Sequence, residues 1–166
     1  MKKKRHKTIS KEEALLRLAR YCAYQDRCHQ EVRSKLLDLG IYGMDLEEII
    51  VELITDDFLN EERFARSYAR GKFRIKRWGR IRIRQELKQR QISDYCIKKA
   101  MQEIEDADYL QCLTELLHNK KALLNESNPF ILRNKLAQYA IRKGFESKLI
   151  WDILKQQDFT KDDSPS

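Results

Sequence analysis

The sequence predicts an all-α protein, arranged as an elongated, curved array of three tandem three-helix repeats. The chain has 166 residues with only 5 glycines and 2 prolines, so few residues interrupt helices. Apolar residues recur at helical spacing along most of it. A pattern of an aliphatic residue, arginine, two further residues and leucine occurs at 32–36, 83–87 and 132–136. These copies are 51 and 49 residues apart, which indicates a repeated unit, although amphipathic helices can also align by chance. Such units contact mainly their neighbours and form elongated molecules.

The first repeat is predicted to span residues 10–59, after a basic arm at 1–9 that we expect to be disordered. Its three helices are predicted to begin at Ser10, near Cys28 and at Asp45. Each of these residues is followed three positions later by a glutamate, the spacing of a capping box.

The second repeat is predicted to span residues 60–105 and to open with one long helix, from a cap at Asn60 to a break at Gly79. Two stripes follow this helix at intervals of three or four residues. The outward stripe consists of Arg63, Arg66, Arg70, Arg74 and Arg77. The stripe predicted to face the core consists of Phe64, Tyr68, Gly71, Ile75 and Trp78.

The rest of the chain is also predicted to be helical. Residues 81–84 alternate like a strand but have no partner strand, so we predict a short helix, followed by another that begins at Ser93. The third repeat is predicted at 106–157, with a helix restarting at Pro129 in the favoured first turn. The polar tail at 158–166 is expected to be disordered.

Charge is distributed unevenly along the chain, whose net charge is +8. Residues 1–9 carry +5, residues 10–59 carry −5, residues 60–105 carry +8 and residues 106–166 carry zero. An elongated molecule with this distribution is predicted to meet a polyanion through its middle and its basic arm.

The middle of the chain contains twelve lysines and arginines between Arg63 and Arg90, against the single acid Glu86. Like charges four residues apart in a helix repel each other, which favours a bound polyanionic or acidic partner over a merely solvated face. Arginine suits two-pronged contacts with phosphate or carboxylate. Trp78 is either a core residue or a platform for a base. The predicted contact residues are Arg63, Arg66, Arg70, Lys72, Arg74, Lys76, Arg77, Arg80, Arg82, Arg84, Lys88 and Arg90.

Catalytic motifs are absent from the sequence: there is no glycine-rich phosphate loop, zinc-protease motif or hydrolase nucleophile motif. We therefore expect no catalytic residues, no cofactor and no metal. The 4 cysteines include no CxxC pair and are expected to be reduced and partly buried. No run of 18 apolar residues and no secretory signal is present, which predicts a cytoplasmic protein without a membrane partner.

Several segments resemble a known family. Residues 58–70 (FLNEERFARSYAR), followed by 78–79 and 83–90, look like the central signature of the RecX regulatory proteins. Residues 26–36 and 144–150 are similar to family elements in the first and third repeats. The resemblance covers about residues 14 to 157 and implies a fold of tandem three-helix repeats.

The resemblance also implies a function. RecX proteins are non-enzymatic regulators that bind the RecA recombinase filament on DNA, lying in its helical groove. We expect this chain to be a monomer. They modulate, and most often inhibit, its ATP hydrolysis, strand exchange and coprotease activity in homologous recombination, DNA repair and the SOS response. Contacts of the basic residues with RecA, and with phosphates of single- or double-stranded DNA, would follow. Two alternatives stay open: a sequence-independent binder of DNA or RNA alone, and an adaptor for acidic proteins.

The chain departs from the family pattern at a few positions. Cys28 stands where a serine cap is usual, and Gly79 lacks the following proline. Asp56 and Asp57 replace a usual glycine, and Gln91 stands where a glycine normally ends the helix. We expect the turn at Gln91 to take a different form.

Overall fold

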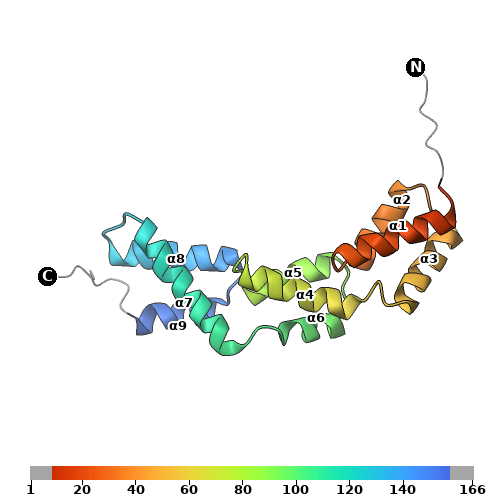
Figure 1. The fold of residues 1–166 in the computed structure, drawn as a ribbon. Coiled ribbons are helices and arrows are strands. Elements are labelled where there is room, and N and C mark those ends of the chain that lie inside the picture. The colour runs from red at the N-terminus through yellow and green to blue at the C-terminus, as the bar shows by residue number, and fades with distance from the viewer. Residues whose placement is uncertain (1–8, 158–166) are drawn as a thin grey trace, which may run out of the picture.

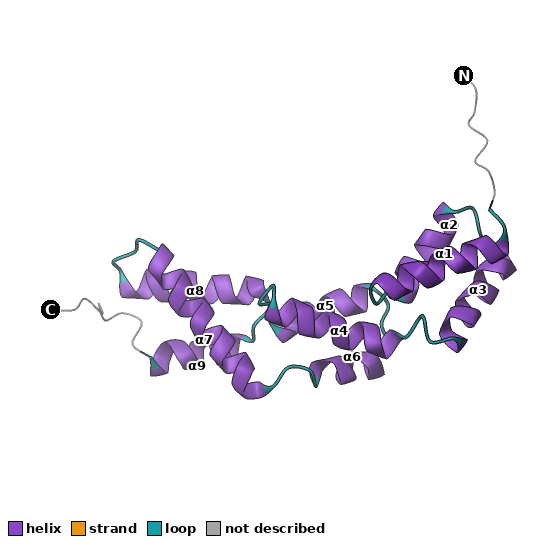
Figure 2. Ribbon diagram, in the orientation of Figure 1, coloured by secondary structure: helices purple, strands orange, loops and turns teal. Residues whose placement is uncertain are grey.

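The computed structural model describes residues 9–157, in which all secondary structure is helical (Figures 1 and 2). The all-α prediction is therefore confirmed. The tail predicted at 158–166 lies outside the described residues, as does the predicted arm except for Ile9. Ile9 packs against the core of the first three helices.

The nine described helices form three bundles along an elongated, bent molecule (Figure 1). The first bundle consists of α1 (Lys11–Tyr24), α2 (His29–Asp38) and α3 (Gly43–Thr55). The middle bundle consists of α4 (Glu61–Arg74), α5 (Arg80–Gln89) and α6 (Asp94–Met101). The third bundle consists of α7 (Asp106–Leu123), α8 (Pro129–Lys143) and α9 (Ser147–Gln156). Helices α2, α5 and α8 follow one another along the upper edge in Figure 1. The predicted curved array of three-helix repeats is thus confirmed.

Two apolar cores hold the bundles together. The first bundle has its own core, with Leu18, Ile49 and Leu53 fully buried. The middle and third bundles share one continuous core, which contains Leu87, Leu113 and many other apolar side chains. Burying one such side chain contributes about 1.5–3 kcal/mol. The first bundle adds Cys28 to the shared core.

Helix starts follow the predicted caps with one exception. The predicted caps Ser10, Asn60 and Ser93 each accept a hydrogen bond from a backbone N–H in the first turn of the helix that follows. Asn128, which is not among the predicted caps, does the same before the predicted restart at Pro129. The prediction that Asp45 opens the third helix is wrong, because α3 begins two residues earlier at Gly43. Asp45 instead lies in the first turn, where its charge complements the positive end of the helix dipole.

The long helix predicted to reach Gly79 ends at Arg74. Beyond it, Arg77 adopts a left-handed conformation with φ 54°, and the N–H of Trp78 donates to the carbonyl of Lys72 at 3.1 Å. The chain therefore reverses before Gly79, so Arg77 and Trp78 lie in a loop rather than on the predicted helical stripes.

One type of turn ends α2, α5 and α8. Gly40, Gln91 and Gly144 all have a left-handed backbone, with φ of 81°, 59° and 99°. The following N–H, from a buried residue, donates to the carbonyl five residues earlier at 2.9–3.1 Å: Ile41 to Leu36, Ile92 to Leu87 and Phe145 to Ala140. The expectation of a different turn at Gln91 is wrong, because glutamine adopts the glycine conformation itself.

Gln91→Gly is expected to stabilise the protein by about 1 kcal/mol. A left-handed conformation costs a residue with a Cβ about 1–2 kcal/mol, and the greater freedom of glycine in the unfolded chain offsets part of the gain. Urea unfolding measures this effect as a higher midpoint concentration, with an unchanged dependence of the unfolding free energy on urea concentration. The matched control is Gly40→Gln, where an added Cβ meets no atom within 4 Å. The control should destabilise by a similar amount, and equal stability of all three proteins would contradict the explanation.

Helices α8 and α5 meet end to end at a glycine pair. The N–H of Gly79 donates to the carbonyl of Lys143 at 2.8 Å, and the N–H of Ile81 donates to the carbonyl of Gly144 at 3.0 Å. The unpaired carbonyls at the end of α8 thus satisfy unpaired amides at the start of α5. A Cβ on Gly79 would lie 2.2 Å from the carbonyl carbon and oxygen of Gly144, so only glycine permits this approach.

Candidate functional site

The twelve predicted contact residues lie on α4, α5 and the loop between them, and their surroundings divide them into two groups. Five are paired with carboxylates of the same chain: Arg63, Arg66, Arg77, Arg80 and Arg90. Seven have no carboxylate partner among residues 9–157: Arg70, Lys72, Arg74, Lys76, Arg82, Arg84 and Lys88.

Arg63 connects the first bundle to the middle bundle. Its Nε donates to Asp26 Oδ1 at 2.8 Å, and its Nη1 donates to Asp57 Oδ2 at 3.1 Å. Its Nη2 also donates to the carbonyls of Asp57 and Phe58. Most donors of this guanidinium are therefore used inside the protein, which favours a structural role for Arg63.

Three more paired arginines connect the middle bundle to the segments that follow it. Arg66 donates to Glu103 at 3.1 Å, Arg77 to Glu115 at 2.9 Å and Arg80 to Asp106 at 2.6 Å. The hydrogen bond from Arg77 lowers the pKa of Glu115. Arg90 donates to Glu86 on its own helix at 3.0 Å.

Tyr109 is a buried residue whose ring packs against the side chain of Arg80. It is 1% exposed, and the Arg80 guanidinium lies 4.1 Å from the centre of its ring. Its hydroxyl accepts a hydrogen bond from the backbone N–H of Arg80 at 3.0 Å and donates one to Glu146 Oε2 at 2.6 Å. Burial, followed by the hydrogen bond to Glu146, raises the pKa of Tyr109, so the hydroxyl stays protonated. Arg80 is thereby fixed by packing as well as by charge.

The unpaired group contains five exposed cations, on the outer faces of α4 and α5 and in the loop: Arg70, Arg74, Lys76, Arg84 and Lys88. The other two members of this group, Lys72 and Arg82, lie against aromatic rings. Lys72 Nζ is 5.3 Å from the centre of the Tyr68 ring and 4.9 Å from that of Trp78. Arg82 lies 3.9 Å above the Trp78 ring.

Cations and rings therefore alternate along one side of the middle bundle. This series, which we term the cation–ring ladder, runs Arg90, Tyr68, Lys72, Trp78, Arg82. Trp78 is half-buried and packs against the shared core, which confirms its core role; a role as a platform for a base stays a prediction.

Lys143 adds a cation that the sequence reasoning missed. Its Nζ donates to the carbonyl of Lys76 at 2.9 Å, although 67 residues separate the two. Burial, followed by the charge of Arg82, lowers the pKa of Lys143. Only the contact between the middle and third bundles places Lys143 at this surface, and no local pattern signals it.

The apolar stripe predicted on α4 lines a groove, and only part of it reaches the core. Ile75 is 80% exposed, and Tyr68 and Gly71 are only half-buried. The buried face of α4 instead comprises Phe64, Ala65, Ala69 and Phe73. The small alanines permit the extensive packing of α4 against α6. The stripe prediction is therefore wrong for Gly71 and Ile75, and Trp78 lies beyond the end of the helix. It is confirmed for Phe64, which is buried, and for Tyr68, which packs against the shared core.

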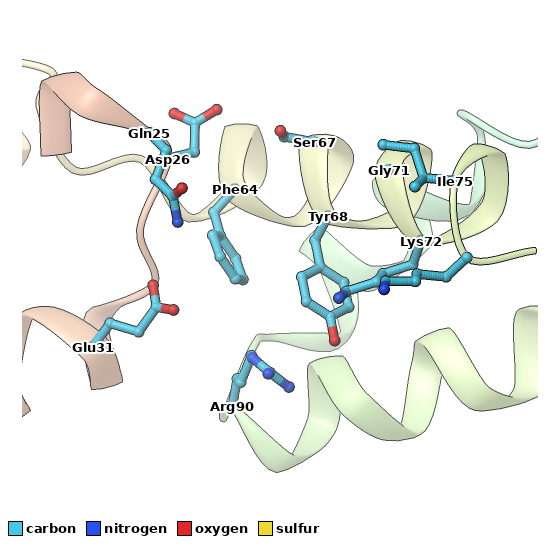
Figure 3. Close-up of a pocket in the computed structure, with 11 residues that line it drawn as sticks. Gln25, Asp26, Glu31, Phe64, Ser67, Tyr68, Gly71, Lys72, Ile75 and Arg90 are labelled. Atoms are coloured by element: carbon cyan, nitrogen blue, oxygen red, sulfur yellow. The ribbon is translucent and has the colours of Figure 1, made fainter. Parts of the chain in front are cut away.

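The groove lies between α4 and the α1–α2 connection of the first bundle (Figure 3). Its volume is about 430 Å³. Phe64 and Tyr68 project into its middle, Asp26 and Glu31 lie at one end, and Lys72 lies at the other.

Residues 9–157 contain no group of three or more histidine, cysteine or acidic side chains that could hold a metal ion. In the same range, no helix is sufficiently long and apolar to span a membrane. The four cysteines are buried and free of disulfide bonds, and burial raises the pKa of each thiol.

Comparisons with known proteins match most of the chain. The family description "RecX, second three-helix domain" matches residues 60–101, and "RecX, third three-helix domain" matches residues 106–154. The regulatory protein RecX of Prosthecochloris aestuarii is 30% identical over 143 residues, covering 86% of this chain and 92% of the relative. The regulatory protein RecX of Bacillus cytotoxicus is 28% identical over 92% of this chain, which spans only 57% of that relative's length.

Solved structures have the same architecture. The crystal structure of RecX from Lactobacillus salivarius superposes with a TM-score of 0.77 at 26% identity, covering 89% of this chain and 96% of that one. A second crystal structure, of a regulatory protein RecX, superposes with a TM-score of 0.80 at 22% identity, covering 89% of this chain and 73% of that one. The similarity to this second structure shows a shared fold and nothing further.

Proposed function

The chain belongs to the RecX family of regulatory proteins, and from this premise we propose that it binds the RecA recombinase filament on DNA and inhibits its ATP hydrolysis. Inhibition of strand exchange and of coprotease activity would follow from the same binding. The chain acts as a cytoplasmic monomer in this proposal, and none of its residues is catalytic.

The observation that carries the proposal is the unpaired positive charge of the middle bundle. The five exposed cations defined above have no carboxylate partner among residues 9–157 and lie close enough in sequence to repel one another. Phosphates of the filament's DNA, or carboxylates of RecA, would relieve that repulsion and form charge-assisted hydrogen bonds. The five paired arginines contribute indirectly, by keeping the helices in place.

The bent, elongated shape supports binding along a filament. A molecule of three bundles in a row can contact more than one filament subunit at once. In this proposal residues 60–105 make the principal contacts, and the repeats at 10–59 and 106–157 determine how far the molecule reaches. Holding neighbouring RecA subunits together would restrict the movements that accompany ATP turnover.

The direct test is a titration of RecA ATP hydrolysis on single-stranded DNA. Full-length protein added to cognate RecA is expected to reduce the steady-state rate at amounts near or below one molecule per RecA. The same titration on a RecA-independent ATPase controls for general effects of a basic protein. An unchanged rate and an unchanged filament length at equimolar protein would overturn the proposal.

The cation–ring ladder favours a second candidate, binding of nucleic acid without RecA. Aromatic rings flanked by cations can stack on bases and hold the adjoining phosphates. Such a binder would keep its affinity for free DNA or RNA in the absence of RecA and lose it steeply as salt rises. Competition by DNA-free RecA polymer is expected only if the filament is the target.

A further inference from the structure

Gly71 lies in the interior of α4, where no contact among the described residues requires a glycine. Glycine in a helix interior is less stable than alanine because it loses more backbone freedom on folding. A Cβ built on Gly71 meets no atom within 4 Å, and its backbone is not left-handed. Neither packing nor backbone geometry therefore requires glycine here, in contrast to Gly79.

Gly71 lines the groove in Figure 3, where it leaves a gap between side chains. Tyr68 and Lys72 lie beside it, and Ile75, one turn later, is 80% exposed. Bare helix backbone thus adjoins uncovered apolar surface. This arrangement suits an inserted side chain that packs directly against the backbone of α4.

The charges of the groove select the chemistry of its occupant. Asp26 uses one carboxylate oxygen on Arg63, and Glu31 uses one on the N–H of Cys28, which leaves the second oxygen of each for a partner. Lys72 supplies positive charge at the opposite end, and Lys76 also lines the groove. A third lining cation, Arg90, is paired with Glu86. A nucleic-acid strand, negative throughout, would be repelled at the acidic end, whereas a polypeptide can carry both signs.

We propose that this groove receives a segment of a protein partner, with an apolar side chain seated against Gly71 and Tyr68. A basic residue of that segment meets Asp26 and Glu31, and an acidic residue meets Lys72 and Lys76. The inference rests on the proposed function, because it takes RecA subunits of the filament as the source of the segment. The other four exposed cations, Arg70, Arg74, Arg84 and Lys88, remain available for phosphates elsewhere on the middle bundle.

The test compares filament binding by the wild-type protein, Gly71→Ala and Gly71→Leu, measured by co-sedimentation with RecA filaments on single-stranded DNA. Leucine fills the gap and is expected to weaken binding about tenfold, and alanine about threefold. Both residues favour helix, and the added Cβ of alanine meets no atom within 4 Å, so the melting temperature of Gly71→Ala should rise by about 2–4 °C. A Gly71→Ala protein that is more stable than the wild type but binds filaments more weakly would show that the groove is blocked and that the protein is not misfolded.

Gln89→Leu is the matched control, because Gln89 is an exposed residue of α5 that does not line the groove. It should bind filaments like the wild type. Binding of Gly71→Leu within twofold of the wild type would overturn the inference. Equal losses for filaments and for free single-stranded DNA would also overturn it, by identifying the occupant as nucleic acid.

The two proposals fail in different ways. If wild-type protein sediments with filaments but leaves ATP hydrolysis unchanged, the proposed inhibition is overturned, while the Gly71→Leu comparison still decides the inference. If wild-type protein does not sediment with filaments, both are overturned.

Discussion

Gly79→Ala is expected to destabilise the protein by about 3 kcal/mol, the upper part of the range for forcing atoms into packed space. The added methyl group would lie 2.2 Å from the backbone of Gly144 and 2.4 Å from the amide nitrogen of Phe145. Backbone atoms cannot rotate aside as side chains do, so α5 and α8 must separate. Their separation would break the hydrogen bonds from Gly79 and Ile81 to the end of α8.

Urea unfolding followed by circular dichroism measures this loss. The matched control is Gly71→Ala, the same substitution eight residues earlier, where the methyl group enters open space. The two variants should shift the midpoint in opposite directions. A Gly79→Ala protein as stable as the wild type would show that the end-to-end contact of α5 and α8 does not form in solution.

Reversing two exposed charges, in the double variant Arg70→Glu/Arg74→Glu, is expected to weaken RecA inhibition about 100-fold. Each reversal replaces an attraction of about 1 kcal/mol by a similar repulsion, and salt screens part of the total. Neither arginine has a carboxylate partner among residues 9–157, so folding stability should stay within about 0.5 kcal/mol of the wild type. The readout is the protein concentration that halves RecA ATP hydrolysis.

The control for this variant is Lys148→Glu/Lys155→Glu, an identical change in net charge on exposed residues of α9. It should inhibit within about threefold of the wild type, since net charge affects association less than local contact does. Equal losses in both double variants would mean that overall charge, rather than the middle bundle, governs inhibition.

Local sequence signals predicted the helical architecture well. The caps at Ser10, Asn60 and Ser93 depend on interactions within one helical turn, so sequence spacing determines them. The helical assignment of residues 81–84 also held, because tertiary packing buries Ile83 as part of a helix.

Features that depend on distant contacts could not be predicted. The division of the arginines into paired and unpaired groups depends on acids such as Glu103 and Glu115, each more than 30 residues from its partner. The left-handed conformation of Arg77, which shortened the predicted helix, has no glycine to signal it. The contact roles of individual basic residues remain predictions.

The two joints of the molecule differ in stiffness. Backbone hydrogen bonds and a shared core fix the third bundle to the middle one, and salt barely affects such contacts. The first bundle has a separate core and contributes only Cys28 to the shared one. Arg63 links it to the middle bundle through partly exposed ion pairs, which salt screens. Rising ionic strength should therefore weaken the contact between the first and middle bundles. The angle between those two bundles should then vary more, while the middle and third bundles move as one rigid unit.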